Sequence, residues 1–152
     1  MENKPQLKVL NFMKIDEELQ QEINEILFEF WKIELKNHYE TGEGIMQKSL
    51  FYAGLCFEGL YLHGKKNHKK AFKCFYVGWH RDKCTYCGHW LADCYFDGTG
   101  VTKSINTSLM LHKKLAIEYQ HQGSINRIED IKNKTIYCYI NFTKKQWKII
   151  NS

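Results

Sequence analysis

The sequence predicts an all-α fold, a short α-solenoid of antiparallel helix pairs. Three observations lead to this prediction: two segments are near-copies of each other, apolar residues recur at helical spacing, and the breaks between predicted helices are short. The chain has 152 residues, of which 43% are hydrophobic, with one proline and ten glycines. This composition suits a single domain with its own core and argues against disorder or a turn-rich β-sandwich.

The first two helices are predicted from apolar spacing. An acidic start at Asp16, Glu17 and Glu18 suits a helix over residues 16–38, because negative charge stabilises a helix N-terminus. The apolar positions of this helix are Leu19, Ile23, Ile26, Leu27, Phe30 and Ile33. A second helix is expected over residues 48–62, where Gly54 and Gly59 would let a neighbouring backbone approach closely.

Capping residues and glycines delimit the next three helices. Asn67 suits the N-cap of a helix that ends near residue 80, and Ser104 the N-cap of one over residues 105–121, which Gly123 would end. A helix over residues 83–96 lies between them and is closed by Gly98 and Gly100. Residues 136–140 are β-prone, and residues 147–150 could pair with them as a small β-hairpin or pack as an extended cap.

The two near-copies keep one register on each side of their loop. The matched positions are Gly54 with Ala92 and Phe57 with Tyr95, each 38 residues apart, then Ala71 with Ser108 and Cys74 with Leu111, each 37 residues apart. One residue is therefore lost in the loop while both helices stay in phase. Such a repeat is typical of helical arrays, which usually present a binding surface rather than a catalytic centre.

Each part of the second copy has a physical role. The small Ala92 permits close helix packing, Tyr95 can project from the same face into the groove, and Val101 pins the loop to the core. Gly98 and Gly100 allow the backbone angles of a tight turn. On the return helix the inner face is expected to carry Leu111, Leu115 and Ala116.

Residues 91–101 read Leu-Ala, two residues, Tyr, two residues, then Gly-x-Gly-Val. This pattern resembles the Sel-one-like repeat, a relative of the tetratricopeptide repeat whose unit is an antiparallel helix pair. The family has Gly at the position of Ala92, and it has Asp and Lys-Ala where this copy has Ser104 and Thr107-Ser108. The first copy keeps Lys70-Ala71 but has a degraded loop. The resemblance covers roughly residues 50 to 122 and implies an adaptor that binds other proteins.

We predict one domain over residues 1–152, with an N-terminal helical cap at 14–48 and a degenerate first repeat at 49–84. The second repeat then spans 85–122, and a C-terminal cap or tail spans 123–152. The structural repeat positions are Gly54, Phe57, Ala71, Leu91, Ala92, Tyr95, Gly98, Gly100, Val101, Leu111 and Ala116. A further loop signature, Tyr39-x-x-Gly42-x-Gly44-Ile45, lies half a repeat ahead of Phe57, and whether it belongs to another unit stays open.

A rival signal is Cys84-x-x-Cys87-x-His89-x4-Cys94, four potential zinc ligands. In a helix the three cysteines share the inner face with Leu91, whereas His89 points elsewhere. We therefore interpret the cysteines as buried structural thiols, with no metal and no cofactor, and keep a zinc-stabilised helical module as an alternative.

The sequence gives no reason to expect an enzyme. Its histidines His63, His68, His80, His112 and His121 fall at predicted loops or helix ends, where we expect hydrated imidazoles. No Cys–His pair stands out as a nucleophile with its base. The lysines Lys65, Lys66, Lys69, Lys70 and Lys73 form the densest basic patch. We interpret it as solvated surface, since the net charge of +5 is modest, and nucleic acid is not the expected partner.

No hydrophobic run is long enough for a membrane span, and residues 1–12 lack the apolar stretch of a signal peptide. A cytoplasmic protein with reduced cysteines is the expectation. The predicted function is a non-catalytic adaptor or scaffold that binds another protein or peptide on its concave face. A degenerate fragment of a larger repeat protein is the remaining alternative.

Overall fold

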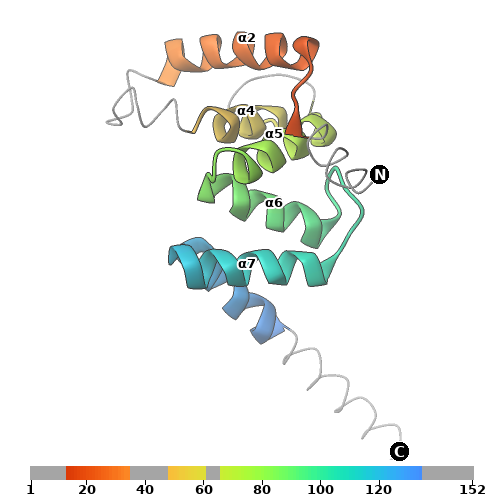
Figure 1. The fold of residues 1–152 in the computed structure, drawn as a ribbon, viewed down its shortest axis with the longest axis vertical. Helices are drawn as coiled ribbons and strands as arrows, with labels where there is room; N and C mark the ends of the chain where they lie inside the picture. Colours follow the sequence, from red (N-terminus) through yellow and green to blue (C-terminus); the bar gives the residue numbers. More distant parts are fainter. Residues whose placement is uncertain (1–12, 35–47, 61–65, 135–152) are drawn as a thin grey trace, which may run out of the picture.

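The computed structural model describes residues 13–34, 48–60 and 66–134, in which helices are joined by short loops and there is no strand (Figure 1). The helices are α2 (Glu17–Glu34), α4 (Ser49–Phe57), α5 (His68–His80), α6 (Thr85–Asp97) and α7 (Ile105–Tyr119). A further helical segment covers residues 122–134. The predicted hairpin at 136–150 and the loop signature at 39–45 lie outside the described residues.

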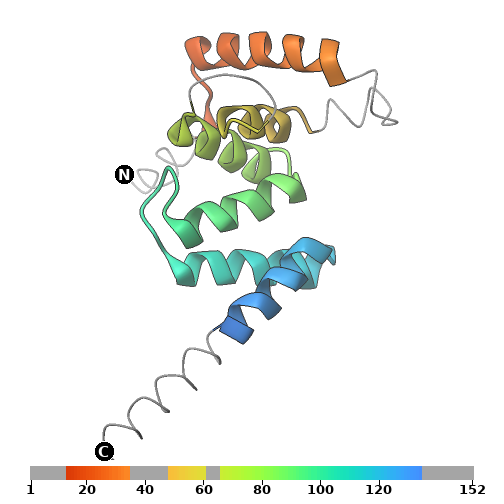
Figure 2. The ribbon, with the colours of Figure 1, turned by 180° about the vertical axis from the view of Figure 1, so that it is seen from behind.

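The helices form a stack in chain order. α2 packs on α4, α4 on α5, α5 on α6, and α6 on α7, as the layers of Figure 1 show. The helical segment 122–134 continues from the far end of α7 and turns back beside it (Figure 2). The prediction of an all-α fold is therefore confirmed, with each helix packed against its neighbours in sequence.

Local capping groups start three of the helices. The Asp16 carboxylate accepts the Leu19 N–H at 2.7 Å before α2, and the Asn67 side chain accepts the Lys70 N–H at 3.0 Å before α5. The Ser104 hydroxyl accepts the Thr107 N–H at 3.3 Å before α7. These bonds satisfy N–H groups that have no partner inside the helix, which is why Asn67 and Ser104 were informative in the sequence.

Two predicted helix ends are wrong. α4 ends at Phe57 rather than near residue 62, because Gly59 adopts a left-handed φ of 80° and the Leu60 N–H turns back to the Leu55 carbonyl. α7 ends at Tyr119, two residues before the predicted end at residue 121, because Gln120 rather than Gly123 takes the left-handed conformation that stops the helix, with φ of 46°. A glutamine in the left-handed conformation is a weaker sequence signal of a helix end than a glycine is.

Stacked aromatic rings join neighbouring helices in the core. Phe30 of α2 stacks on Tyr52 of α4 with ring centroids 4.8 Å apart, and Phe75 of α5 stacks on Trp90 of α6 at 5.7 Å. Gly54 makes room for Phe75, since a Cβ there would lie 2.4 Å from its ring. The expectation that Gly54 admits a neighbouring backbone is therefore wrong: it admits a side chain.

The loop between α6 and α7 follows the predicted turn. Gly98 and Gly100 have φ of 72° and 74°, in the left-handed region that glycine favours. A Cβ at Gly100 would lie 2.3 Å from the His68 carbonyl oxygen, so this loop is packed against the start of α5. Val101 is half-buried against the core, as expected of a residue that pins the loop.

Candidate functional site

The predicted repeat positions are packing positions, not parts of an open site. Gly54, Phe57, Ala71, Leu91 and Ala92 are buried. Those that are only half-buried are Tyr95, Gly98, Gly100, Val101, Leu111 and Ala116. Tyr95 meets the ring of Phe72 edge to face, with centroids 5.5 Å apart, so it joins α6 to α5. A functional site must be sought among other residues.

The four candidate zinc ligands do not converge. Cys84 occupies the N-cap of α6, Cys87 and Cys94 are buried, and His89 contacts Ser124 and Asp93 instead of the cysteines. Within the three described ranges, no three His, Cys, Asp or Glu side chains lie where they could share an ion. The geometry therefore gives the zinc alternative no support.

A histidine that the sequence analysis placed on the surface is fully buried. His112 lies in the middle of α7, with its Nε2 atom 3.1 Å from Asp93 Oδ1 and its Nδ1 atom 3.0 Å from Ser124 Oγ. Because an ionised carboxylate only accepts hydrogen bonds, the His112 Nε2–H donates to Asp93. The expected hydrated imidazole at this position is wrong, because two polar partners on neighbouring helices replace the water.

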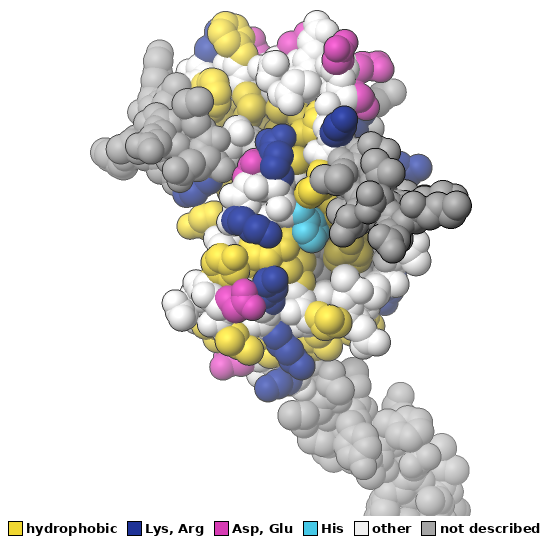
Figure 3. All heavy atoms as spheres, viewed as in Figure 1, with side chains coloured by type: hydrophobic (Ala, Val, Ile, Leu, Met, Phe, Trp, Pro, Cys, Tyr) yellow, Lys and Arg dark blue, Asp and Glu magenta, His cyan; other side chains and the backbone are white. Residues whose placement is uncertain are grey.

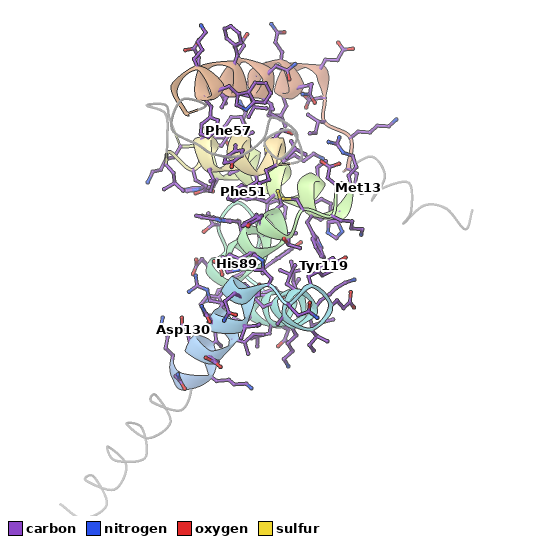
Figure 4. The ribbon with its side chains drawn as sticks, turned by 90° about the vertical axis from the view of Figure 1, so that its left-hand side faces the viewer. Met13, Phe51, Phe57, His89, Tyr119 and Asp130 are labelled. Carbon is purple, nitrogen blue, oxygen red and sulfur yellow. The ribbon has the colours of Figure 1, made fainter. Side chains whose placement is uncertain are left out.

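Two more side chains complete this network, which we name the His112 network (His89, Asp93, His112, Ser124 and Arg127). His89 Nδ1 is 3.3 Å from Ser124 Oγ, and His89 Nε2 is 3.5 Å from Asp93 Oδ2. The Arg127 guanidinium donates to Asp93 Oδ2 at 3.0 Å. Figure 4 shows His89 on α6, close to the helical segment that carries Asp130.

The surroundings shift two of these groups in the same direction. Burial lowers the pKa of His89 to about 4, and although Asp93 opposes this, the charges of His112, His121 and Arg127 add to it. Burial by itself would raise the pKa of Asp93, but the His112 hydrogen bond, His89 and Arg127 together lower it. The network is therefore built around an ionised Asp93 and a neutral His89.

Ser124, His112 and Asp93 have the composition of a nucleophile with its base and orienting acid. However, Ser124 and His112 are both fully buried, so a substrate has no access to the hydroxyl. Asp93 comes from α6, His112 from α7, and Ser124 and Arg127 from residues 122–134. What the arrangement does is hold these three helices together through directional hydrogen bonds.

A pocket that is open to solvent shares Asp93 with the His112 network. Its volume is about 120 Å³, and we call it the acidic pocket, lined by Glu58, Trp90, Asp93, Cys94, Asp97 and Thr99. Glu58 Oε2 is 2.9 Å from His68 Nδ1. The other oxygen, Oε1, is buried and has no hydrogen-bond partner in the described part of the chain.

This pocket was not predicted from the sequence. Trp90, Asp93 and Asp97 recur at helical spacing on α6, which was the available signal, but Glu58 comes from the end of α4 and only the fold brings it near. Three carboxylates around one indole favour a positively charged guest, because the indole face attracts cations as well.

The basic patch is partly used within the fold. The Lys70 ammonium pairs with Glu22 of α2 at 2.6 Å, and Lys65 lies outside the described residues. On the face seen in Figure 3, Lys and Arg side chains are separated by apolar and uncharged ones rather than gathered in one field. None of the helices in the described ranges is both long and apolar enough to cross a membrane.

Comparison with known proteins adds no relative to this picture. No protein-family model, curated protein or solved structure matches the chain. The resemblance to the Sel-one-like repeat therefore stays a prediction from the sequence.

Proposed function

We propose that this protein is a non-catalytic adaptor, a short Sel-one-like α-solenoid in the cytoplasm that binds another protein through a basic side chain of that partner. The observation that supports this proposal is the acidic pocket, which Glu58, Asp93 and Asp97 line together with Trp90. A Lys or Arg side chain is the guest that this chemistry favours.

The position of the pocket suits a peptide ligand. Glu58 follows α4, whereas Trp90, Asp93 and Asp97 lie on α6, and α4 and α6 are the first helices of two successive pairs in the stack. In helical arrays the extended binding surface runs across equivalent helices of neighbouring units. A peptide lying across α4 and α6 would therefore pass over the pocket.

The size of the pocket also suits a side-chain head group. A water molecule takes up about 30 Å³ of liquid, so a cavity of about 120 Å³ holds a guest several waters in size. An ammonium with its last methylenes, or a guanidinium, has that scale. A cation over an indole face gains about 0.5 to 2 kcal/mol, depending on how far it is desolvated.

The acidic pocket still has hydrogen-bond acceptors for such a guest. Asp93 is already bound by His112 and Arg127, and one oxygen of Glu58 is bound by His68. The buried Glu58 Oε1 atom and the exposed carboxylate of Asp97 are left. A buried acceptor without a donor destabilises the empty state, so a donor from a partner would gain more here than at an open surface.

A peptide library tests this proposal. Peptides with a central Lys or Arg should bind, and replacing that residue by norleucine or glutamine should raise Kd about tenfold, or about 1.4 kcal/mol. The double substitution Glu58→Gln with Asp97→Asn should raise Kd for the basic peptides by a similar factor. Glu118→Gln with Asp130→Asn removes the same charge from exposed positions outside the pocket and is the matched control.

For the proposal to stand, the pocket variant must bind the basic peptides with a higher Kd than the control variant does. Equal Kd values would mean that the pocket plays no part and that any charge dependence comes from the whole surface. Equal binding of the basic and uncharged peptides would exclude a cationic guest.

A further inference from the structure

Two cysteines meet at the start of α6. Cys84 is the N-cap residue and Cys87 lies in the first turn of the helix. The tight turn after α5 holds them there: the Lys83 N–H donates to the Trp79 carbonyl and the Cys84 N–H to the Gly78 carbonyl, both at 3.0 Å. Lys83 itself has a left-handed φ of 54°, so the turn positions Cys84 through a backbone conformation that few residues adopt freely.

The two thiols have different surroundings. Cys84 is half-buried, whereas Cys87 is fully buried and packed against Gly78, where a Cβ would lie 2.4 Å from the Cys87 sulfur. Cys84 is at the N-cap and Cys87 three residues later, the two positions whose side chains lie next to each other at a helix start. Cys84 is thus the more accessible residue of the pair, and Cys87 is closed to solvent.

The pKa values of the two thiols are shifted in opposite directions. The hydrogen bond from Cys87 is the main cause that lowers the pKa of Cys84 to about 7, against burial, and the N–H groups of Tyr86 and Cys87 and the Lys48 ammonium add to it. The Cys84 sulfur makes no capping hydrogen bond of standard geometry, so these N–H groups act mainly through their field. Burial raises the pKa of Cys87 well above its ordinary value, and the neighbouring Cys84 raises it further.

We propose that Cys84 and Cys87 are a redox-active dithiol, which a low-molecular-weight disulfide of the glutathione type oxidises to an intramolecular disulfide. The placement of a half-buried cysteine at the N-cap and a fully buried one three residues later in the same helix carries this assignment. It is independent of the acidic pocket, which neither cysteine lines.

The reaction has two balanced steps. The Cys84 thiolate attacks one sulfur of the oxidant, forming a mixed disulfide and releasing one thiolate, which takes up a proton from water. Cys87 then loses its proton to solvent and attacks the Cys84 sulfur, which forms the Cys84–Cys87 bond and releases the second thiol. Two electrons pass from the cysteine pair to the oxidant, which leaves as two thiols.

Peptide mapping of the full chain tests the assignment. The reduced protein is incubated with oxidised glutathione, denatured, alkylated and digested with trypsin, which leaves Cys84, Cys87 and Cys94 in one peptide, residues 84–103. We expect this peptide to carry three alkyl groups before oxidation and one after it, on Cys94. A disulfide that includes Cys94, or no disulfide in excess oxidant, would overturn the proposal.

Two variants separate the roles of the sulfurs. Cys87→Ser should accumulate a glutathione adduct on Cys84, at a rate that rises with pH around a midpoint near 7. Cys84→Ser should lower the rate of adduct formation at least about tenfold, because the remaining sulfur is inaccessible and protonated. Cys56→Ala, in the core of α4, keeps the pair and should leave the oxidation product unchanged.

Serine nearly preserves the shape of cysteine, and circular dichroism of each variant checks that it folds. If Cys84→Ser and Cys87→Ser react alike, the two sulfurs are ordinary thiols and the proposal fails. Mapping of the unsubstituted chain decides the same question should either variant not fold. Bound zinc at about one equivalent that protects both thiols would also overturn it.

Discussion

Phe75 in α5 and His112 in α7 occupy equivalent places in the two helix pairs, 37 residues apart, and both side chains are fully buried. Phe75 stacks on Trp90 of the following helix, whereas His112 forms hydrogen bonds with Asp93 and Ser124. Each residue lies where its own pair meets the next helix. The first of these joints is an aromatic stack, and the second is a hydrogen-bonded network.

The neighbouring positions change in the same way. Equivalent pairs, 37 or 38 residues apart, are Phe51 with His89, Leu55 with Asp93, Ala71 with Ser108 and Trp90 with Arg127. The positions equivalent to His89, Asp93, His112 and Arg127 are thus all apolar in the first pair and its joint. A buried polar network is directional, and it is strongly destabilised when one member is lost, although an apolar joint can be just as stable. The stability of the second joint should also depend on pH because it contains His89, whereas the Phe75–Trp90 stack of the first joint has no titratable group.

The largest effect is expected from the apolar joint. Phe75→Ala removes the ring that stacks on Trp90 and fills the space beside Gly54, so we expect the free energy of unfolding to fall by about 3 to 5 kcal/mol. Urea unfolding followed by circular dichroism measures it. A loss below about 1 kcal/mol would mean that the joint between α5 and α6 does not depend on this ring.

The polar joint should be nearly as sensitive to a single loss. Asp93→Ala leaves the buried His112 Nε2–H and the Arg127 guanidinium without their acceptor, and we expect a cost of about 2 to 4 kcal/mol. Asp97→Ala, one turn later on the exposed side of α6, is the control and should cost less than about 0.5 kcal/mol. Equal losses in the two variants would show that the network contributes no more than a surface carboxylate does.

The same substitution in the loops of the two helix pairs should also differ in its cost in stability. Gly100 and Gly59 both have left-handed φ values, but only at Gly100 would a Cβ meet backbone, the His68 carbonyl. At Gly59 the nearest atoms belong to the flexible Lys66 side chain. We expect Gly100→Ala to cost about 2 kcal/mol and Gly59→Ala about 1 kcal/mol. Thermal melts compare them, and the reverse order would contradict the packing of this loop on α5.

The smallest effect is the pH dependence of the polar joint. The pKa of His89 is about 4 in the folded chain, below the ordinary value of 6.5, so between these pH values the unfolded chain binds a proton that the folded chain does not. Stability should therefore rise with pH through this window, be complete above it, and fall as the pH drops toward 4. We expect His89→Asn to reduce the difference in unfolding free energy between pH 7 and pH 4.5 by about 1 to 2 kcal/mol.

The pH dependence of the parent protein must be compared with that of His89→Asn, because other histidines also contribute to the pH dependence of stability. Burial also lowers the pKa of His80 and His121, so the curve of the unsubstituted protein contains their contributions too. Identical pH dependence in the variant and the parent would show that His89 is not the group that titrates.

Local signals explain how much of the fold could be predicted from sequence. Asn67 and Ser104 cap helices through bonds to residues three positions away, and Gly98 and Gly100 set a turn by their own backbone angles. Such features depend on the nearest residues alone. The end of α4 was misplaced because the apolar pattern continues past Phe57, and only the conformation of Gly59 stops the helix.

The candidate sites depend on long-range contacts and were harder to predict. His112 was grouped with the histidines at loops and helix ends, although it falls inside the predicted helix 105–121 and its alignment with Phe75 at the repeat distance was a usable signal of burial. The acidic pocket forms only because the fold brings Glu58 beside α6. Cys84 and Cys87 were considered as half of a candidate zinc site, whereas in the structure they mark the start of α6.

Hydrogen exchange by mass spectrometry at pH 7 and pH 5 tests the difference between the two joints most directly, after correction for the intrinsic pH dependence of exchange. We predict that protection of residues 122–134 falls at pH 5 relative to the centre of α5, and that His89→Asn narrows this difference. Equal changes in protection in both segments, or a loss confined to α5, would contradict the account.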